Sequence, residues 1–274
     1  MLPRFRRVVP HSSEEALVCW RELGGMFCAG GQALLMEMAL GRRVPDVLVD
    51  LSELEPADVA ARDGLVMVDS LSTLDSLELR PEVPPLLRAA ARSVGFASIR
   101  SRATIVGNLC HGLPTGEMSL ALVALQGAVH GVLPDGTATT KTEDSIFSLR
   151  PVGDRSELFI RSVSWPRPDA STNADFYEVG EQGSWQPALS VATMLTPLPD
   201  GAATVSAAVG LRDGGGTAHL EFALPADARA GHLRELVVGA IRVADGLDCG
   251  RLSDWVTDVV SARVAETRAR PGGT

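Results

Sequence analysis

The sequence has little lysine, few aromatic side chains and no long apolar run. Lys141 is the only lysine among 25 basic residues, the formal net charge is −9, and no segment gathers arginines into a stripe. Nucleic acids need such a positive field, so a nucleic-acid partner is not expected. No apolar run reaches the roughly 18–20 residues of a membrane span. The start MLPRFRRVVPHSSEE also lacks the apolar stretch of a signal peptide, so we expect a cytoplasmic protein.

Paired metal ligands are missing as well. Cys19, Cys28, Cys110 and Cys249 are scattered, with no C-x-x-C pair among them. Zinc sites, iron–sulfur clusters and disulfide frameworks all need closer spacings, so we expect no metal in this chain. No H-E-x-x-H pattern occurs, and no Ser-His-Asp order can be argued, which disfavours metalloenzymes and hydrolases.

Apolar residues make up 45% of the 274 residues and recur with the spacings of both helices and strands. Ser12 and Glu15 form a capping box, and Gly24-Gly25 ends the helical pattern that follows it. Helices and strands alternate as far as residue 166, which is typical of an α+β architecture. We expect helices at 13–24, 33–40, 86–94 and 118–125, and strands at 26–28, 47–51, 65–68, 129–133 and 158–165.

A boundary is expected at Pro166-Arg167-Pro168, because proline ends a strand. The later pattern predicts strands near 189–195, 203–211 and 218–223, then helices around 232–244 and 251–268. The expected domains are residues 1–166, in two subdomains of about 1–54 and 55–166, and residues 169–274.

Two glycine-containing junctions are the most informative local features. Ala29-Gly30-Gly31 lies between a strand and a helix, and Ala103–Asn108 forms a second strand or loop before a polar turn and an apolar helix. Glycine lets the backbone approach a ligand closely, and the start of a helix directs unpaired N–H groups at negative charge. Both junctions would suit a pyrophosphate, but a plain strand-to-helix connection has the same appearance.

Two long segments give these junctions a context. CAGGQALLMEMALGRRVPDVLVDLSEL resembles the A-G-G-x-x-L-L segment and the following strand of the FAD-binding subunits of carbon monoxide and xanthine dehydrogenases. SIRSRATIVGNLCHGLPTGEMSLALVAL resembles their I-R-N-x-A-T-I-G-G-N segment. The resemblance to these molybdenum hydroxylases implies a two-part FAD-binding domain of the molybdopterin dehydrogenase type. It also implies a C-terminal domain of the CO dehydrogenase flavoprotein type, with a three-stranded antiparallel sheet and helices.

The resemblance also implies site residues and shows where this sequence departs from the family. Gln32-Ala33 replaces the usual Thr-Asp or His-Ser, Val106 replaces the first glycine of G-G-N, and Glu117 stands in place of an aspartate near the ribose and adenine. Glu178 takes the place of a basic residue. The implied FAD-binding residues are Ala29, Gly30, Gly31, Gln32, Ala33, Leu34, Thr104, Val106, Gly107, Asn108 and Glu117.

Further side chains are candidates for chemistry, each beside a plainer explanation. His111 has the residue type of an acid or base near neutral pH, or it is a hydrogen-bonded loop histidine. Glu117 and Glu178 either face one cavity as catalytic carboxylates or lie in solvated loops. Tyr177 and Trp185 either line an apolar substrate pocket or pack in a core.

Three functions are consistent with these residues. The first is an FAD-dependent oxidoreductase subunit that receives electrons from molybdenum and iron–sulfur centres on partner subunits. The second is a standalone enzyme on a degenerate flavoprotein scaffold, such as a flavin-free cyclase or isomerase acting on a largely apolar small molecule, for example a natural-product intermediate. The third is a non-catalytic assembly subunit. The first is favoured, because A-G-G, the T-I-x-G-N remnant and an acidic residue are present.

Overall fold

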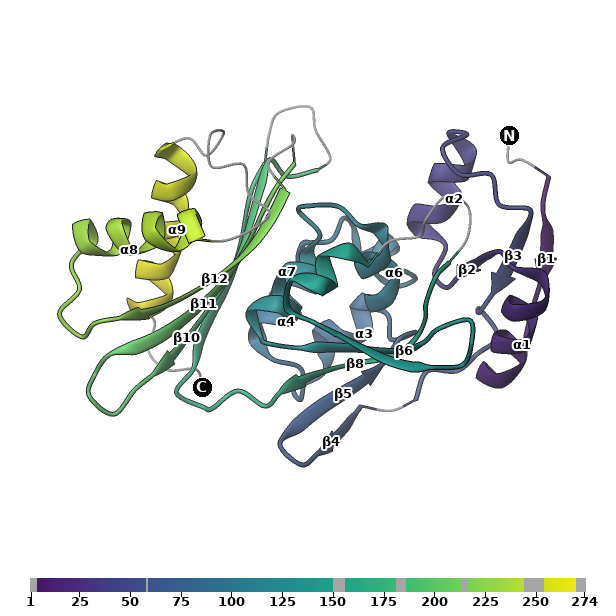
Figure 1. The fold of residues 1–274 in the computed structure, drawn as a ribbon, viewed down its shortest axis with the longest axis horizontal. Coiled ribbons are helices and arrows are strands. Elements are labelled where there is room, and N and C mark those ends of the chain that lie inside the picture. The colour runs from purple at the N-terminus through teal and green to yellow at the C-terminus, as the bar shows by residue number, and fades with distance from the viewer. Residues whose placement is uncertain are drawn as a thin grey trace.

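The computed structural model describes residues 4–57, 59–149, 156–180, 186–212, 216–243 and 254–269. Its strands form three sheets that follow one another along the molecule in chain order (Figure 1). The mixed content of helices and sheets confirms the α+β class. Within the described ranges, no helix is both long enough and apolar enough to cross a membrane.

The first sheet is small and parallel, in the order β1-β3-β2. Its strands are β1 (Arg6–Val8), β2 (Met26–Cys28) and β3 (Val47–Asp50), and its helices are α1 (Ser13–Leu23) and α2 (Gln32–Ala39). The Ser12 hydroxyl accepts the Glu15 N–H at the start of α1, and Gly24 ends the helix with φ 67°. These local signals account for the prediction of α1 from the sequence, whereas strand β1 was not expected.

The second sheet has five strands in the order β4-β5-β8-β6-β7. A layer of helices lies on one of its faces (Figure 1). The largest core fills the space between sheet and helices and contains Trp165, which is fully buried, and most of α7. The strands are β4 (Ala60–Arg62), β5 (Leu65–Asp69), β6 (Ala128–Val132), β7 (Ala138–Thr142) and β8 (Phe159–Pro166). The helices are α3 (Leu74–Leu79), α4 (Pro85–Ser93), α5 (Ala97–Arg100), α6 (Ile105–His111), α7 (Glu117–Ala124) and the 3₁₀ turn η1 (Glu143–Ser148).

The third sheet is antiparallel in the order β12-β11-β10-β9, with α8 (Ala230–Val243) and α9 (Asp254–Ala269) on one side. Its strands are β9 (Asn173–Val179), β10 (Leu189–Pro197), β11 (Ala203–Leu211) and β12 (Gly216–Leu224). The expectation of three strands was therefore wrong, because it omitted β9. This edge strand carries polar residues on both faces, so the alternation that identifies a half-buried strand is absent from it.

Alternate residues of the third sheet face two different layers. Ala192 and Ala208 join the main core against α4 and α7, together with Phe176 of β9. Val191 and Val205 face the other way and pack with α8 and α9. The sheet therefore lies between the helices of the central region and the two C-terminal helices, as Figure 1 shows.

Candidate functional site

The first glycine junction connects the end of β2 to the start of α2. Gly31 has φ 72°, in the left-handed region, and serves as the N-cap of α2. The first N–H groups of an α-helix have no partner within the helix, and within the described chain no side chain caps those of α2. The predicted residues 29–34 are all partly exposed. This junction therefore offers backbone donors at an accessible surface.

The second junction differs from the sequence expectation of a strand or loop that reaches residue 108. Thr104 is the N-cap of α6, and its hydroxyl accepts the Gly107 N–H at 3.0 Å. Val106, Gly107 and Asn108 therefore lie inside the helix. The Thr104 cap, three residues before Gly107, is the signal that identifies this helix start.

The two junctions touch each other. A Cβ atom on Gly30 would overlap the carbonyl oxygen of Arg102 and would lie 2.6 Å from its carbonyl carbon. Only glycine permits this close approach of two backbones. Helices α2 and α6 are also in contact. The structure thus brings the two sequence motifs together, although about 70 residues separate them in the chain.

Val106 does not obstruct this arrangement. Its side chain is half-buried and packs against the main core. The neighbouring Gly107 is exposed and lies on the same turn of α6. The branched side chain expected at the cofactor is therefore engaged with the protein interior.

Asn108 and Glu117 join α6 to the start of α7. The Asn108 Nδ2 donates to Glu117 Oε2 at 2.8 Å, and its Oδ1 accepts the Met118 N–H at 3.0 Å. Burial raises the pKa of Glu117, and the hydrogen bond from Asn108 opposes that shift. These two hydrogen bonds therefore link α6 to the start of α7.

Glu178 lies on β9 and faces the same region. Burial is the largest cause that raises its pKa, to about 7, and the charge of Glu117 is the second. Hydrogen bonds from Ser190 and Ser93 act in the opposite direction, and the Ser190 hydroxyl lies 3.4 Å from Glu178 Oε1. The structure therefore places the two glutamates close enough for their charges to interact. Such a pair can hold one proton near neutral pH.

His111 ends α6 and faces α2. Burial is the main cause that lowers its pKa, while the charge of Glu37 raises it and that of Arg43 lowers it. Its electrostatic neighbours therefore come from α2 and the turn after it. The lowered pKa favours the neutral imidazole, in which one ring nitrogen can accept a proton.

Tyr177 and its neighbour Glu178 point to opposite faces of the sheet, because side chains alternate along β9. Its ring lies 4.0 Å beneath the guanidinium of Arg263 in α9, on the sheet face opposite to that of Phe176. Because successive strand residues point to opposite faces, Tyr177 points away from the face that carries Phe176 and Glu178, and its role in an apolar substrate pocket stays a prediction. Trp185 and Cys249 lie outside the described residues.

Comparison with known proteins decides the family. Residues 3–168, more than half of the chain, match the FAD binding domain in molybdopterin dehydrogenase. The chain belongs to this family. It is 29% identical over 218 residues to the nicotine 6-hydroxylase medium subunit of Paenarthrobacter nicotinovorans, a stretch that covers 76% of each protein. It is 30% identical over 149 residues to the carbon monoxide dehydrogenase medium chain of Hydrogenophaga pseudoflava, covering 52% of this chain and 51% of that one.

Solved structures show that the resemblance of fold extends beyond the matched domain. A chain of the Cu,Mo-CO dehydrogenase superposes with a TM-score of 0.81 at 20% identity, covering 99% of this chain and all of that one. A chain of quinoline 2-oxidoreductase from Pseudomonas putida 86 gives a TM-score of 0.76 at 19% identity, covering 98% and 96%. The C-terminal sheet and helices therefore belong to the same fold.

Family membership makes this chain an FAD-binding protein of the molybdenum hydroxylase type, and the residues present fit the cofactor. Gly30 leaves no space for a side chain, and the uncapped start of α2 provides N–H donors for a pyrophosphate. On the second side, the Gly107 N–H is already bonded to Thr104, so α6 contributes shape more than free donors. These findings favour the flavoprotein hypothesis over a flavin-free cyclase or isomerase.

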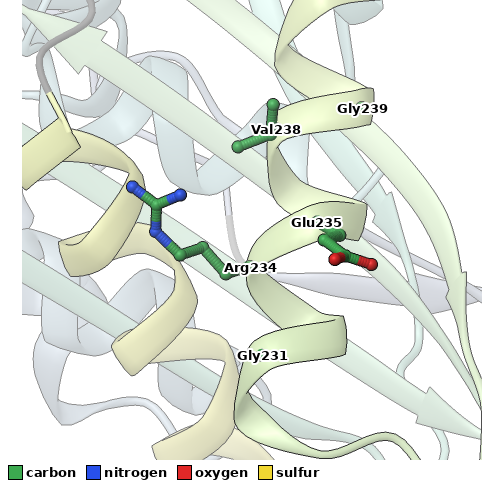
Figure 2. A pocket seen from close by; sticks show the side chains of 5 residues that line it. All are labelled: Gly231, Arg234, Glu235, Val238 and Gly239. Atoms are coloured by element: carbon green, nitrogen blue, oxygen red, sulfur yellow. The ribbon is translucent and has the colours of Figure 1, made fainter.

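A separate hollow of about 410 Å³ lies on α8 (Figure 2). Arg234 points from α8 towards α9 and pairs with Asp258 at 2.8 Å. All five lining residues come from one helix, so the hollow is a surface feature without converging polar groups. These residues are Gly231, Arg234, Glu235, Val238 and Gly239.

Proposed function

We propose that this chain is the flavin subunit of a molybdenum hydroxylase complex. In this role it passes electrons from molybdenum and iron–sulfur centres on separate subunits to an external acceptor. The observation that carries the proposal is the contact between the two glycine junctions at Gly30 and Arg102. The relatives support the existence of partner subunits, since one is the medium subunit of nicotine 6-hydroxylase and another is the medium chain of carbon monoxide dehydrogenase.

The side chains around the junctions have distinct proposed tasks. Residues 29–34 hold the FAD pyrophosphate through backbone N–H groups at the start of α2. Thr104 fixes the start of α6, and the pair of Asn108 and Glu117 holds α6 against α7. Bound FAD would supply the redox chemistry, because flavins accept hydride and also exchange single electrons.

The acid–base candidates remain proposals for the protons that accompany electron transfer. The carboxyl group of Glu178, with a pKa of about 7, holds or releases a proton near neutral pH beside Glu117. A ring nitrogen of His111 accepts a proton on the side of α2. The cytoplasmic location and the lack of a nucleic-acid partner stay predictions from the sequence.

Purification of the tagged chain from its native host tests the proposal. We expect stoichiometric FAD in the eluate, together with molybdenum and iron carried by co-purifying subunits. Flavin absorbance, released-flavin analysis and metal analysis measure these three components separately. FAD without molybdenum or iron would overturn the proposed complex and leave a flavoprotein that acts alone. A folded protein that holds no flavin and takes up no added FAD would overturn the flavin role itself.

A further inference from the structure

Arg102 is fixed against the first glycine junction by its own backbone. Its carbonyl group occupies the space beside Gly30 that a side chain would fill. Any movement of residue 102 relative to the junction is therefore restricted on that side. Arg102 occupies the variable position of the I-R-N-x-A-T segment, so the motif alone gives it no role.

The side chain of Arg102 is exposed and uncommitted. Across the described ranges, it makes no ion pair and no hydrogen bond to another residue. Its charge nevertheless reaches Cys28, where it lowers the pKa of the thiol against the larger effect of burial. The Cys28 Sγ lies 3.5 Å from the position of a Cβ on Gly31. The guanidinium is therefore close to the turn that starts α2.

The other guanidinium whose charge acts on Cys28 is that of Arg7, and it is engaged in an ion pair. Arg7 pairs with Asp50 at 2.6 Å, and this ion pair holds β1 against β3. Arg102 thus differs from Arg7 in having its charge available to a ligand. An exposed arginine without a carboxylate partner is suited to phosphate, since its planar fork matches phosphate oxygens.

A cation at this junction would complement the negative pyrophosphate. The chain carries a net charge of −9, and Gln32-Ala33 at the start of α2 supply no positive charge. Backbone N–H groups alone would have to balance the negative pyrophosphate. We propose that the guanidinium of Arg102 binds the pyrophosphate of FAD at the first glycine junction, an inference that rests on the FAD-binding function above.

Flavin binding by matched variants tests this inference. The proteins are the wild type, Arg102→Gln, Arg102→Lys and, as a control, Arg62→Gln, which removes an exposed guanidinium from β4. Each is stripped of flavin and titrated with FAD and with riboflavin, which lacks phosphates, by flavin fluorescence. We expect Arg102→Gln to weaken FAD binding on the order of tenfold, and Arg102→Lys to weaken it less. Riboflavin binding should be the same in all four proteins.

Salt gives an independent readout. The affinity of the wild type for FAD should fall more steeply with added salt than that of Arg102→Gln, because exposed ion pairs are screened. If Arg102→Gln binds FAD as tightly as the wild type, the inference is wrong. Residue 102 then contributes to the junction only through its backbone carbonyl group, and the proposed FAD-binding function stands. An equal loss of riboflavin binding would show damage to the fold and would also overturn it. A wild type that binds no FAD would remove both proposals.

Discussion

Replacing Glu178 with glutamine should make the protein more stable at alkaline pH. The substitution keeps the size of the side chain and an oxygen that accepts from Ser190, but removes a charge that is half-buried beside Glu117. The pKa of Glu178 rises from its ordinary value of 4.5 to about 7 in the folded protein. Between these two pH values, the folded chain holds a proton that the unfolded chain has already released.

The sign of the effect follows from that difference. Stability falls as pH rises from 4.5 to about 7, and the full penalty is present above that range. The shift corresponds to at most roughly 3 kcal/mol, and water around the half-buried group reduces this to about 1–2 kcal/mol. Glu178→Gln should therefore match the wild type near pH 4.5 and exceed its stability by about 1–2 kcal/mol near pH 8.

Urea unfolding of both proteins across this pH range, with excess FAD present, measures the difference. Asp63→Asn is the matched control, because it removes one negative charge from an exposed turn. In a chain of net charge −9, this control reports the general relief of repulsion. A Glu178→Gln variant with the same advantage at every pH, or with less stability than the wild type near pH 8, would refute the reasoning.

Three further substitutions test contacts described above. Gly30→Ala should lower the free energy of unfolding by about 1–3 kcal/mol and weaken FAD binding, because the added Cβ overlaps the Arg102 carbonyl group. Urea unfolding and flavin titration check these two effects. Asn108→Leu should lower the free energy of unfolding by about 1–3 kcal/mol, because the buried Glu117 loses its hydrogen-bond donor. Adding Glu117→Gln to this variant should recover part of the lost stability, and no recovery in the double variant would count against the prediction. Gly210→Ala should cost about 1–3 kcal/mol, since its Cβ overlaps the backbone before α7; an unchanged urea midpoint would contradict this contact.

Local signals made the helices and strands between residues 13 and 50 predictable, although strand β1 before them was not expected. The cap of Ser12 on Glu15 and the glycines after α1 and before α2 act within a few residues, so their structural effect is readable from sequence. The family could be identified from the two long motifs, and the match of residues 3–168 to the family's FAD binding domain confirmed it. Strand β9 was missed because an edge strand with mixed faces carries no clear period.

Contacts between distant segments were not predictable in the same way. Glu117 and Glu178 were paired only as one of two alternatives, because their approach depends on the register of β9 against β10. The contact of Gly30 with Arg102 depends on how α2 and α6 pack, and no local pattern encodes it. The packing of Tyr177 against Arg263 could not be read from the sequence either, because it depends on which face of β9 meets α9.

The sandwich position of the third sheet has a consequence for modularity. The recognised family domain ends at residue 168, yet Ala192 and Ala208 complete the core around α4 and α7. Gly210 also brings β11 against the carbonyl group of Pro114, in the loop that leads into α7. A fragment cut after residue 168 would therefore open an apolar wall to water. We therefore expect the unit that folds cooperatively to be larger than the matched family domain and to include the C-terminal sheet.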